Sequence, residues 1–188
     1  MPSSPPQILS TASPSDTSAT CEAHNLEATE LTSLHSLAVA AKSTAYCPYS
    51  QFRVGAALLT HSGDYVSGAN VENASYPVGT CAERVALARA VTDRHRGFKA
   101  LAVATDTSPP SSPCGMCRQF IREFCALDMP VLMFDGAGGY VVLKVEEVGG
   151  VLFLFNDTTL TLTLTHRFPP LPPEMYESLL LSHLPIHR

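Results

Sequence analysis

The sequence predicts a single layered α/β domain, and three observations support this fold class. Stretches with the three- and four-residue apolar spacing of helices alternate along the chain with short apolar runs typical of strands. The length of 188 residues suits one domain with a full core and is short for two. Hydrophobic residues make up 45% of the chain and charged residues 15%, which is typical of a folded protein rather than a disordered one.

The first predicted element is an amphipathic helix over 26–45, where apolar residues recur at three- and four-residue steps. It ends before Pro48, because a residue that precedes proline avoids helical geometry. Two apolar runs, 54–60 and 65–71, are separated by the turn residues 62–64 and predict a hairpin. The remaining predicted elements are, in chain order, a helix over 81–92, a strand over 100–105, a helix over 114–126 and two strands over 131–134 and 140–145.

The two ends of the chain differ from this region. Residues 1–24 are rich in Ser, Thr and Pro, and we expect a disordered tail there, because so few large apolar residues cannot offset the entropy of ordering. Residues 149–188 are predicted to be an atypical, poorly ordered extension. Within it, a Leu/Thr-rich stretch suggests two β segments, 151–155 and 158–165, which form either an added hairpin or an aggregation-prone strand.

Composition narrows the classes of partner and compartment. The net charge of −5 and the lack of a basic stripe argue against a nucleic acid held by its phosphates, whereas a small neutral substrate meets no such objection. Neither a secretory signal nor an apolar run long enough to span a membrane is visible. We therefore expect a cytoplasmic, membrane-free protein whose thiols serve metal binding or catalysis rather than disulfides.

Two cysteine motifs carry the chemistry, and each lies where a helix is predicted to begin. They are Thr80-Cys81-Ala82-Glu83-Arg84 and Pro113-Cys114-Gly115-Met116-Cys117-Arg118-Gln119. Three thiolates suit zinc, and three protein ligands leave the fourth tetrahedral position open for water. Zinc-bound water beside a carboxylate, here Glu83, is typical of the active site of a hydrolase.

Helix geometry predicts how the sulfurs meet. Cys114 and Cys117 are three residues apart and share a helix face. Ser112 is expected as the N-cap of their helix, with Pro113 as its first residue, and Thr80 as the N-cap of the other helix. The sulfurs would then lie beside unpaired backbone N–H groups, which stabilise thiolates.

Each candidate residue also has a structural interpretation. Thr80 and Glu83 match a capping box, in which the glutamate bonds to the N-cap backbone. The three cysteines also fit a structural zinc knuckle with Cys47, Cys125 or a histidine as fourth ligand, although the histidines are scattered without ligand spacing. For the cations we predict that Arg84, ahead of Arg118, donates hydrogen bonds to ligand sulfur.

The order and spacing of four segments resemble the cytidine deaminases that act on free nucleosides. The segments are 45–58, Asn70-Val71-Glu72-Asn73-Ala74, Cys81-Ala82-Glu83-Arg84 and Pro113-Cys114-Gly115-Met116-Cys117-Arg118-Gln119. The resemblance implies zinc-dependent deamination of cytidine and deoxycytidine to uridine and deoxyuridine. Zinc would be held by Cys81, Cys114 and Cys117, and Glu83 would shuttle protons. It also implies a three-layer α/β/α sandwich with a mixed five-stranded sheet over 25–148, and a homotetramer.

The same resemblance assigns the residues that bind substrate. Asn70 and Glu72 would hydrogen-bond the ribose, and Phe52 would stack near the base. From the residues alone, the first two equally fit a polar turn, and Phe52 fits an ordinary core aromatic. The other residues assigned to the pocket are Ala74, Tyr76 and the backbone N–H of Ala82.

The resemblance ends near Val148. Members of the family usually continue with a segment whose aromatic residue closes a neighbouring subunit's pocket, and here only Phe168-Pro169-Pro170 is similar to it. Residues 149–167 are therefore expected to lie outside the ordered core. Two other functions remain open: deamination of bases within RNA or DNA, which needs a basic, aromatic-lined groove, and a non-catalytic, zinc-stabilised interaction module.

Overall fold

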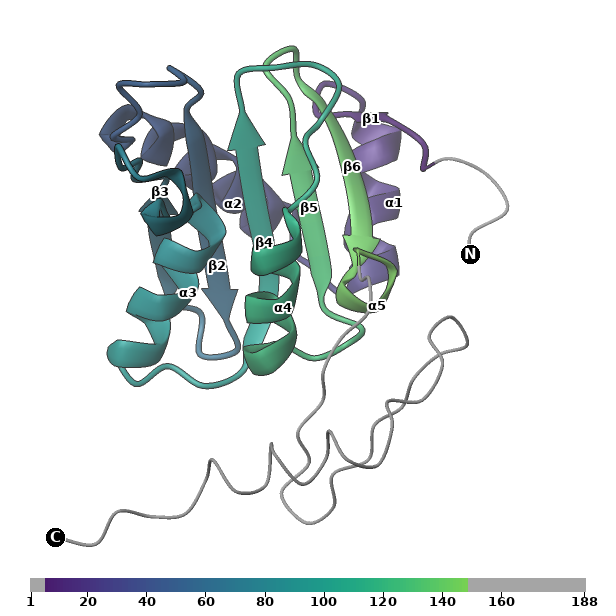
Figure 1. Cartoon of the computed structure of the whole chain (residues 1–188). Coiled ribbons are helices and arrows are strands. Elements are labelled where there is room, and N and C mark those ends of the chain that lie inside the picture. Colours follow the sequence, from purple (N-terminus) through teal and green to yellow (C-terminus); the bar gives the residue numbers. More distant parts are fainter. Residues whose placement is uncertain (1–5, 149–188) are drawn as a thin grey trace, which may run out of the picture. The chain divides into compact units, whose positions relative to one another are not determined.

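A mixed six-stranded sheet forms the middle layer of the structure, a computed structural model that describes residues 6–148. The strand order is β1-β6-β5-β4-β2-β3, and helices cover both faces of the sheet (Figure 1). The strands are β1 (Leu9–Ser10), β2 (Val54–Thr60), β3 (Tyr65–Ala69), β4 (Phe98–Thr105), β5 (Pro130–Phe134) and β6 (Gly139–Lys144). The helices are α1 (Pro14–His24), α2 (Ala28–Ala41), α3 (Ala82–Thr92), α4 (Gly115–Phe124) and α5 (Val145–Val148), with short 3-10 turns η1 (Lys42–Thr44) and η2 (Tyr76–Val78).

The three-layer α/β/α sandwich is confirmed, and so are the predicted helices and strands between α2 and β6, with ends that differ by a few residues. The predicted strand number was wrong by one. Among the strands of residues 6–148, only β4 and β5 run parallel, because α4 connects them as a crossover helix, whereas every other pair is antiparallel.

Two separate cores lie on the two faces of the sheet. On β2, Ala57 and Leu59 face the side covered by α2, while Ala56 and Leu58 face the side covered by α3 and α4. Successive strand residues point to opposite faces, so a strand covered on both sides is a continuous apolar run rather than an alternating one.

Two glycines allow helices to lie unusually close to the sheet. A Cβ atom at Gly55 would be 2.1 Å from the carbonyl oxygen of Ala38 in α2, and one at Gly68 would be 2.5 Å from the backbone nitrogen of Ala86 in α3. Any side chain at Gly68 would push α3 away from β3. This close packing fixes where α3 begins, and its first turn carries the first cysteine motif.

The prediction of a disordered tail over 1–24 is wrong for residues 9–24, which form β1 and α1. The side chain of Ser13 caps α1, Asn25 ends it in the left-handed conformation, and β1 pairs with β6. The hydroxyl groups of Thr20 and Tyr140 are 2.8 Å apart in the core. Much of the Ser, Thr and Pro content therefore supplies caps and a polar outer face, which composition alone does not distinguish from disorder.

The C-terminal predictions, including the β segments 151–155 and 158–165 and the role of Phe168, lie outside the described residues. Within 6–148, no helix has the length and apolar character needed to cross a membrane.

Candidate metal centre and substrate pocket

The candidate site lies at one edge of the sheet, where three chain segments converge. β3 and β4 both end at this edge, and the antiparallel β2 begins there, since Val54 pairs with Thr105 and Gly55 pairs with Ala69. The loops that follow β3 and β4 lead directly into α3 and α4. Loops at the carboxyl ends of neighbouring strands are the usual position of ligand sites in α/β folds.

Three cysteine sulfurs meet at the starts of α3 and α4. The Sγ atom of Cys114 is 3.8 Å from that of Cys81 and 3.5 Å from that of Cys117. All three atoms lie within 4.8 Å of one another. Cys81 is half-buried, Cys114 is exposed and Cys117 is fully buried, so one side of the cluster opens outward.

The predicted capping residues were wrong by one or two positions. Cys81 itself is the N-cap of α3 and Cys114 that of α4, and neither side chain makes a capping hydrogen bond. Thr80, Ser112 and Pro113 therefore precede the helices. Because the sulfurs occupy the cap positions without capping, they remain available beside the first backbone N–H groups.

The spacing of the sulfurs fits zinc. Thiolates arranged tetrahedrally at the usual Zn–S distance of about 2.3 Å lie about 3.8 Å apart. The cluster that could hold a metal ion among residues 6–148 consists of these three cysteines; Cys47, Cys125 and the described histidines do not belong to it. Burial raises the pKa of the Cys125 thiol to about 12, which further disfavours it as a ligand.

The Cys81 and Cys117 thiols are electrostatically unequal. The neighbouring Cys117 side chain lowers the pKa of Cys81 to about 5, and Arg84 contributes to this effect. The same contact with Cys81 raises the pKa of Cys117 above its ordinary value. Cys81 therefore ionises before Cys117, and a metal that binds both sulfurs must displace the proton held by Cys117.

The two arginines of the motifs have different environments. Arg118 donates from Nε to the carbonyl of Pro113 at 2.7 Å and from Nη2 to Ser112 Oγ at 3.2 Å, so it holds the loop before α4. Arg84 donates from Nη2 to the carbonyl of Gly79 at 3.0 Å, while its buried Nε has no hydrogen-bond partner. The Arg84 side chain also interacts with the Cys81 and Cys117 sulfurs, so its positive charge favours ionised thiolates there.

Glu83 lies in the first turn of α3 and is only 4% exposed. Burial raises the pKa of its carboxyl group, although hydrogen bonds from its own backbone N–H and from the Cys117 thiol oppose the shift. The capping-box interpretation is not supported, since it requires Thr80 as the N-cap and Cys81 occupies that position. The side chain thus sits beside the sulfurs without a capping role.

A pocket of about 310 Å³ opens next to Cys81. The predicted residues Asn70, Glu72 and Tyr76 line it, whereas Phe52, Ala74 and Ala82 are not among its lining residues. Its other lining residues, which the sequence analysis did not assign to substrate binding, are Tyr49, Ser50, Val71, Asn73, Gly79 and Thr80. Tyr49 and Ser50 lie within 45–58, the first segment that resembles the family. Their place in that segment could have pointed to them as pocket residues.

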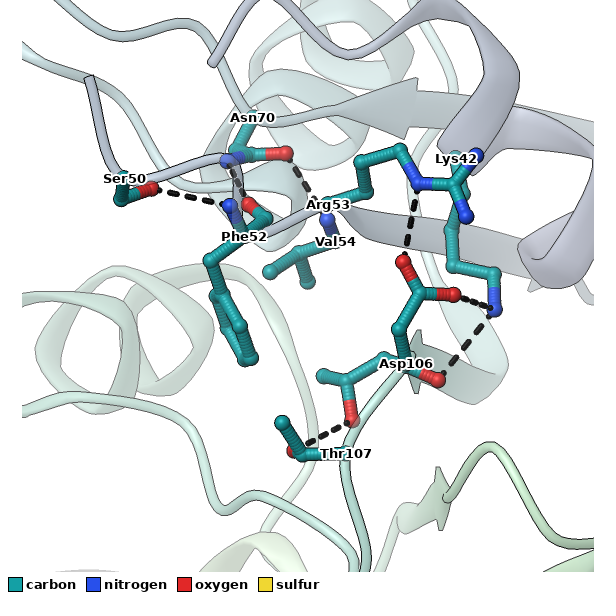
Figure 2. A network of polar contacts seen from close by, with 9 residues as sticks. Lys42, Ser50, Phe52, Arg53, Val54, Asn70, Asp106 and Thr107 are labelled. Atoms are coloured by element: carbon teal, nitrogen blue, oxygen red, sulfur yellow. Dashed lines mark hydrogen bonds and ion pairs between the residues drawn. The ribbon is translucent and has the colours of Figure 1, made fainter. Parts of the chain in front are cut away.

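Asn70 and Glu72 hold the chain segment that precedes β2. The Asn70 side chain accepts a hydrogen bond from the Val54 backbone N–H and donates one to the Phe52 carbonyl, both at 2.8 Å (Figure 2). Glu72 accepts from the backbone N–H groups of Tyr49 and Ser50 at 3.0 and 3.2 Å, and also from the Ser50 hydroxyl. Donation by that hydroxyl lowers the pKa of Glu72. Both side chains therefore shape this side of the pocket.

Three thiols that leave one tetrahedral position open, beside a buried carboxyl group and a pocket, describe a zinc-dependent hydrolase rather than a closed structural zinc site. Comparison with known proteins specifies the class further. Residues 28–133 match the model of the cytidine and deoxycytidylate deaminase zinc-binding region, which is more than half of the 188 residues.

Individual relatives agree with the family model. A cytidine deaminase of Sporosarcina psychrophila is 55% identical over 98 residues, which are 52% of this chain and 72% of the relative. One of Halalkalibacterium halodurans is 45% identical over 111 residues, 59% of this chain and 84% of the relative. The crystal structure of cytidine deaminase from Burkholderia pseudomallei superposes with a TM-score of 0.61 at 41% identity, covering 62% of this chain and 94% of that one.

The chain therefore belongs to the cytidine and deoxycytidylate deaminase family. It is a hydrolase, and its cofactor is zinc.

Proposed function

We propose that this protein deaminates free cytidine and deoxycytidine to uridine and deoxyuridine and releases ammonia. The observation that carries the proposal is the cluster of three sulfurs beside the buried Glu83, at the edge of a pocket of about 310 Å³. That volume lies at the lower end of the range of small-molecule sites, which suits a single nucleoside. The names of the relatives support the same substrate.

In this proposal Cys81, Cys114 and Cys117 bind the zinc ion, which when bound makes water acidic enough to serve as a nucleophile near neutral pH. The buried position of Glu83 supports a role as proton carrier. Its carboxylate takes a proton from the attacking water and gives it to N3 of the pyrimidine while oxygen adds to C4. Glu83 then moves the remaining hydroxyl proton to the amine, which leaves as ammonia, so the atoms of one water are fully accounted for.

The pocket residues are proposed to orient the nucleoside. Glu72 and Asn70 are the candidates for the ribose hydroxyls: each retains hydrogen-bonding capacity beyond its contacts to the chain, since a carboxylate has about four acceptor sites and an amide has two N–H donors. Phe52 would stack near the base. Tyr76, Ala74 and the Ala82 backbone N–H complete the proposed contacts.

Free nucleosides rather than nucleic acid are the proposed substrates. The net charge of −5 supports this, because a protein that tracks a single strand needs a positive groove. A comparison of cytidine with a single-stranded, cytosine-containing oligonucleotide tests it directly. We expect turnover of cytidine alone, and a preference for the oligonucleotide would reverse the assignment.

The protein is also proposed to act as a homotetramer in the cytoplasm. Exposed apolar side chains gather near the pocket: Tyr76 is 79% exposed and Val78 is 64% exposed. Val71, which also lies there, forms backbone β-bridges with Tyr46 and Thr80. A second copy of the chain would cover them. All six cysteines lie in the described region as free thiols, which suits a reducing compartment. Multi-angle light scattering on the full chain tests the assembly, and a monomer would exclude it.

The decisive experiment is an absorbance assay of cytidine with the purified zinc-loaded protein, run with measurement of ammonia and of bound zinc. We expect equal amounts of uridine and ammonia, and one zinc per chain. A zinc-loaded protein that releases no ammonia from cytidine or deoxycytidine would contradict the proposal.

A further inference from the structure

We propose that Asp106 is a positioning residue for the substrate pocket. Through Arg53 it holds the segment 50–54, and with it Phe52, in the place that nucleoside binding requires. The inference rests on the proposed function, since the role of Phe52 in stacking near the base belongs to that proposal.

The register of the sheet brings Asp106 and Arg53 together. Val54, the first residue of β2, pairs with Thr105, the last residue of β4. The residue before Val54 and the residue after Thr105 are therefore neighbours across the strand ends. The Nε atom of Arg53 lies 2.8 Å from Asp106 Oδ2, so an ion pair joins the two segments at the point where the strand pairing ends (Figure 2).

Asp106 is itself held in place on its other sides. Lys42, at the end of α2, donates to Asp106 Oδ1 at 2.8 Å and to the Thr105 carbonyl at 3.2 Å. The loop after β5 also approaches, since a Cβ atom at Gly136 would lie 2.5 Å from the Asp106 carbonyl oxygen. Asp106 is thus an anchor held on two sides, by Lys42 and by the loop after β5, and Arg53 is the group that it restrains.

The segment that Asp106 restrains carries Phe52 between two attachments. The Phe52 backbone N–H donates to Ser50 Oγ at 3.0 Å, and its carbonyl accepts from Asn70. Ser50 is in turn held by Glu72, on the pocket side. Figure 2 shows the Phe52 ring pointing away from the Asn70 amide. Arg53, the next residue, supplies a further attachment through its ion pair with Asp106.

The segment depends on such attachments because its backbone is not regular. Gln51 has φ +56°, a left-handed conformation that residues other than glycine rarely adopt. Such a conformation persists when surrounding contacts impose it. The contact between Asp106 and Arg53 is one of these, and its loss is expected to loosen the segment rather than to unfold the domain.

Asp106 also begins the loop that ends at Cys114. A substitution at Asp106 could therefore change activity by displacing the candidate metal ligands, and the experiment has to distinguish this effect from the positioning of Phe52.

The variants are Asp106→Ala, Arg53→Ala and the double variant, each prepared as the full zinc-loaded chain. Asp93→Ala is the matched control, because Asp93 forms an exposed ion pair with Arg89 at the far end of α3.

In cytidine assays we expect Asp106→Ala and Arg53→Ala each to raise KM about fivefold and to change kcat less than about twofold, since stacking that is equal in the ground and transition states affects KM alone. The double variant should be no worse than either single variant, because both remove the same link. Zinc content should equal that of the unaltered protein in every case. Additive effects, an unchanged KM or a loss of zinc would overturn the proposal.

Hydrogen exchange provides a readout that does not depend on turnover. The backbone N–H groups of Phe52 and Val54 should exchange faster in Asp106→Ala and in Arg53→Ala than in the Asp93→Ala control. Unchanged exchange would overturn the positioning role even if the proposed function holds. If the unaltered protein fails to deaminate cytidine, the proposed function fails and the exchange data still decide the link. Should Asp106→Ala not fold, Arg53→Ala, whose side chain is 53% exposed, tests the same contact.

Discussion

Cys81 and Cys114 occupy the same position on two different helices: each is the N-cap, and their Sγ atoms are 3.8 Å apart. Because both helices begin at the same edge of the sheet, two remote parts of the chain each deliver a thiol at a helix start. The third thiol, Cys117, follows within the first turn of α4. This relationship joins two short motifs into one cluster that could hold a metal ion.

Replacing Glu83 with Gln should remove activity and leave the metal in place. Loss of the proton-carrying group should lower kcat by roughly 10²–10⁴-fold, the usual contribution of general acid–base catalysis, while zinc content stays unchanged. Steady-state kinetics and metal analysis on the same sample measure both. Glu123→Gln, an exposed change on α4, is the control. Full activity in Glu83→Gln would show that Glu83 does not carry the proton.

Replacing Cys81 with Ser should release zinc, because it removes a thiolate that the site needs. The matched control is Cys47→Ser, since Cys47 is a half-buried thiol outside the cluster. Zinc content per chain and the midpoint of thermal unfolding should both fall in the first variant and stay at the unaltered values in the second. Equal loss of zinc from both variants would contradict the ligand assignment.

Replacing Arg84 with Gln should weaken metal binding without removing a ligand. Partners behind a metal site typically affect metal affinity by roughly 10–100-fold. Arg84 is such a partner of Cys81, whose pKa it lowers, and its buried Nε has no hydrogen-bond partner. Competition with a zinc chelator measures the effect. Arg89→Gln, on the exposed side of the same helix, should behave as the unaltered protein does. An affinity in Arg84→Gln that matches this control would show that the sulfurs do not rely on Arg84.

The ion pair between Lys99 and Glu30 should make stability depend on pH. Lys99 Nζ lies 2.6 and 2.8 Å from the two carboxylate oxygens and links β4 to α2. Burial raises the pKa of Glu30, but the hydrogen bonds from Lys99 and from the Glu27 backbone outweigh it, so the net pKa is lowered from 4.5. A carboxyl group with a lowered pKa stabilises the fold above its unfolded-state pKa, and this contribution is lost as the pH falls through the folded-state value.

We therefore expect Glu30→Gln to reduce the free energy of unfolding by about 1 kcal/mol at pH 7. The gap should close as the pH is lowered below 4.5, the ordinary pKa of this group. Urea denaturation of both proteins across this range measures the gap, and Glu22→Gln on the exposed side of α1 controls for general effects of acid and of zinc loss. A gap that stays constant with pH would mean that ionisation of Glu30 is not responsible.

Replacing Tyr140 with Phe should destabilise the N-terminal helix. The change removes the partner of the buried Thr20 hydroxyl, and an unpaired buried polar group costs about 1–3 kcal/mol. Urea denaturation should show a loss of that size, while the kinetics with cytidine stay unchanged because both residues lie away from the pocket residues. Unchanged stability would indicate that α1 contributes little to the fold.

Much of the site could be predicted from the sequence because its chemistry lies in short motifs. The first motif places a cysteine two residues from Glu83, and the second places two cysteines three residues apart. Helix periodicity placed both motifs at helix starts. The alternation of helices and strands likewise indicated the layers. Residues 9–24 were mispredicted because caps, a two-residue edge strand and one buried hydroxyl pair leave no apolar pattern to detect.

The sequence by itself determined the kinds of ligand, the carboxylate beside them and the order of the elements, since these depend on residue type and local spacing. Only the tertiary structure decided that Cys81 and Cys114 share one centre, that Arg118 serves a loop while Arg84 keeps a buried donor free, and that Asp106 meets Arg53. Each of these is a contact between segments far apart in the chain. Such contacts follow from strand register and helix packing, which local patterns do not encode.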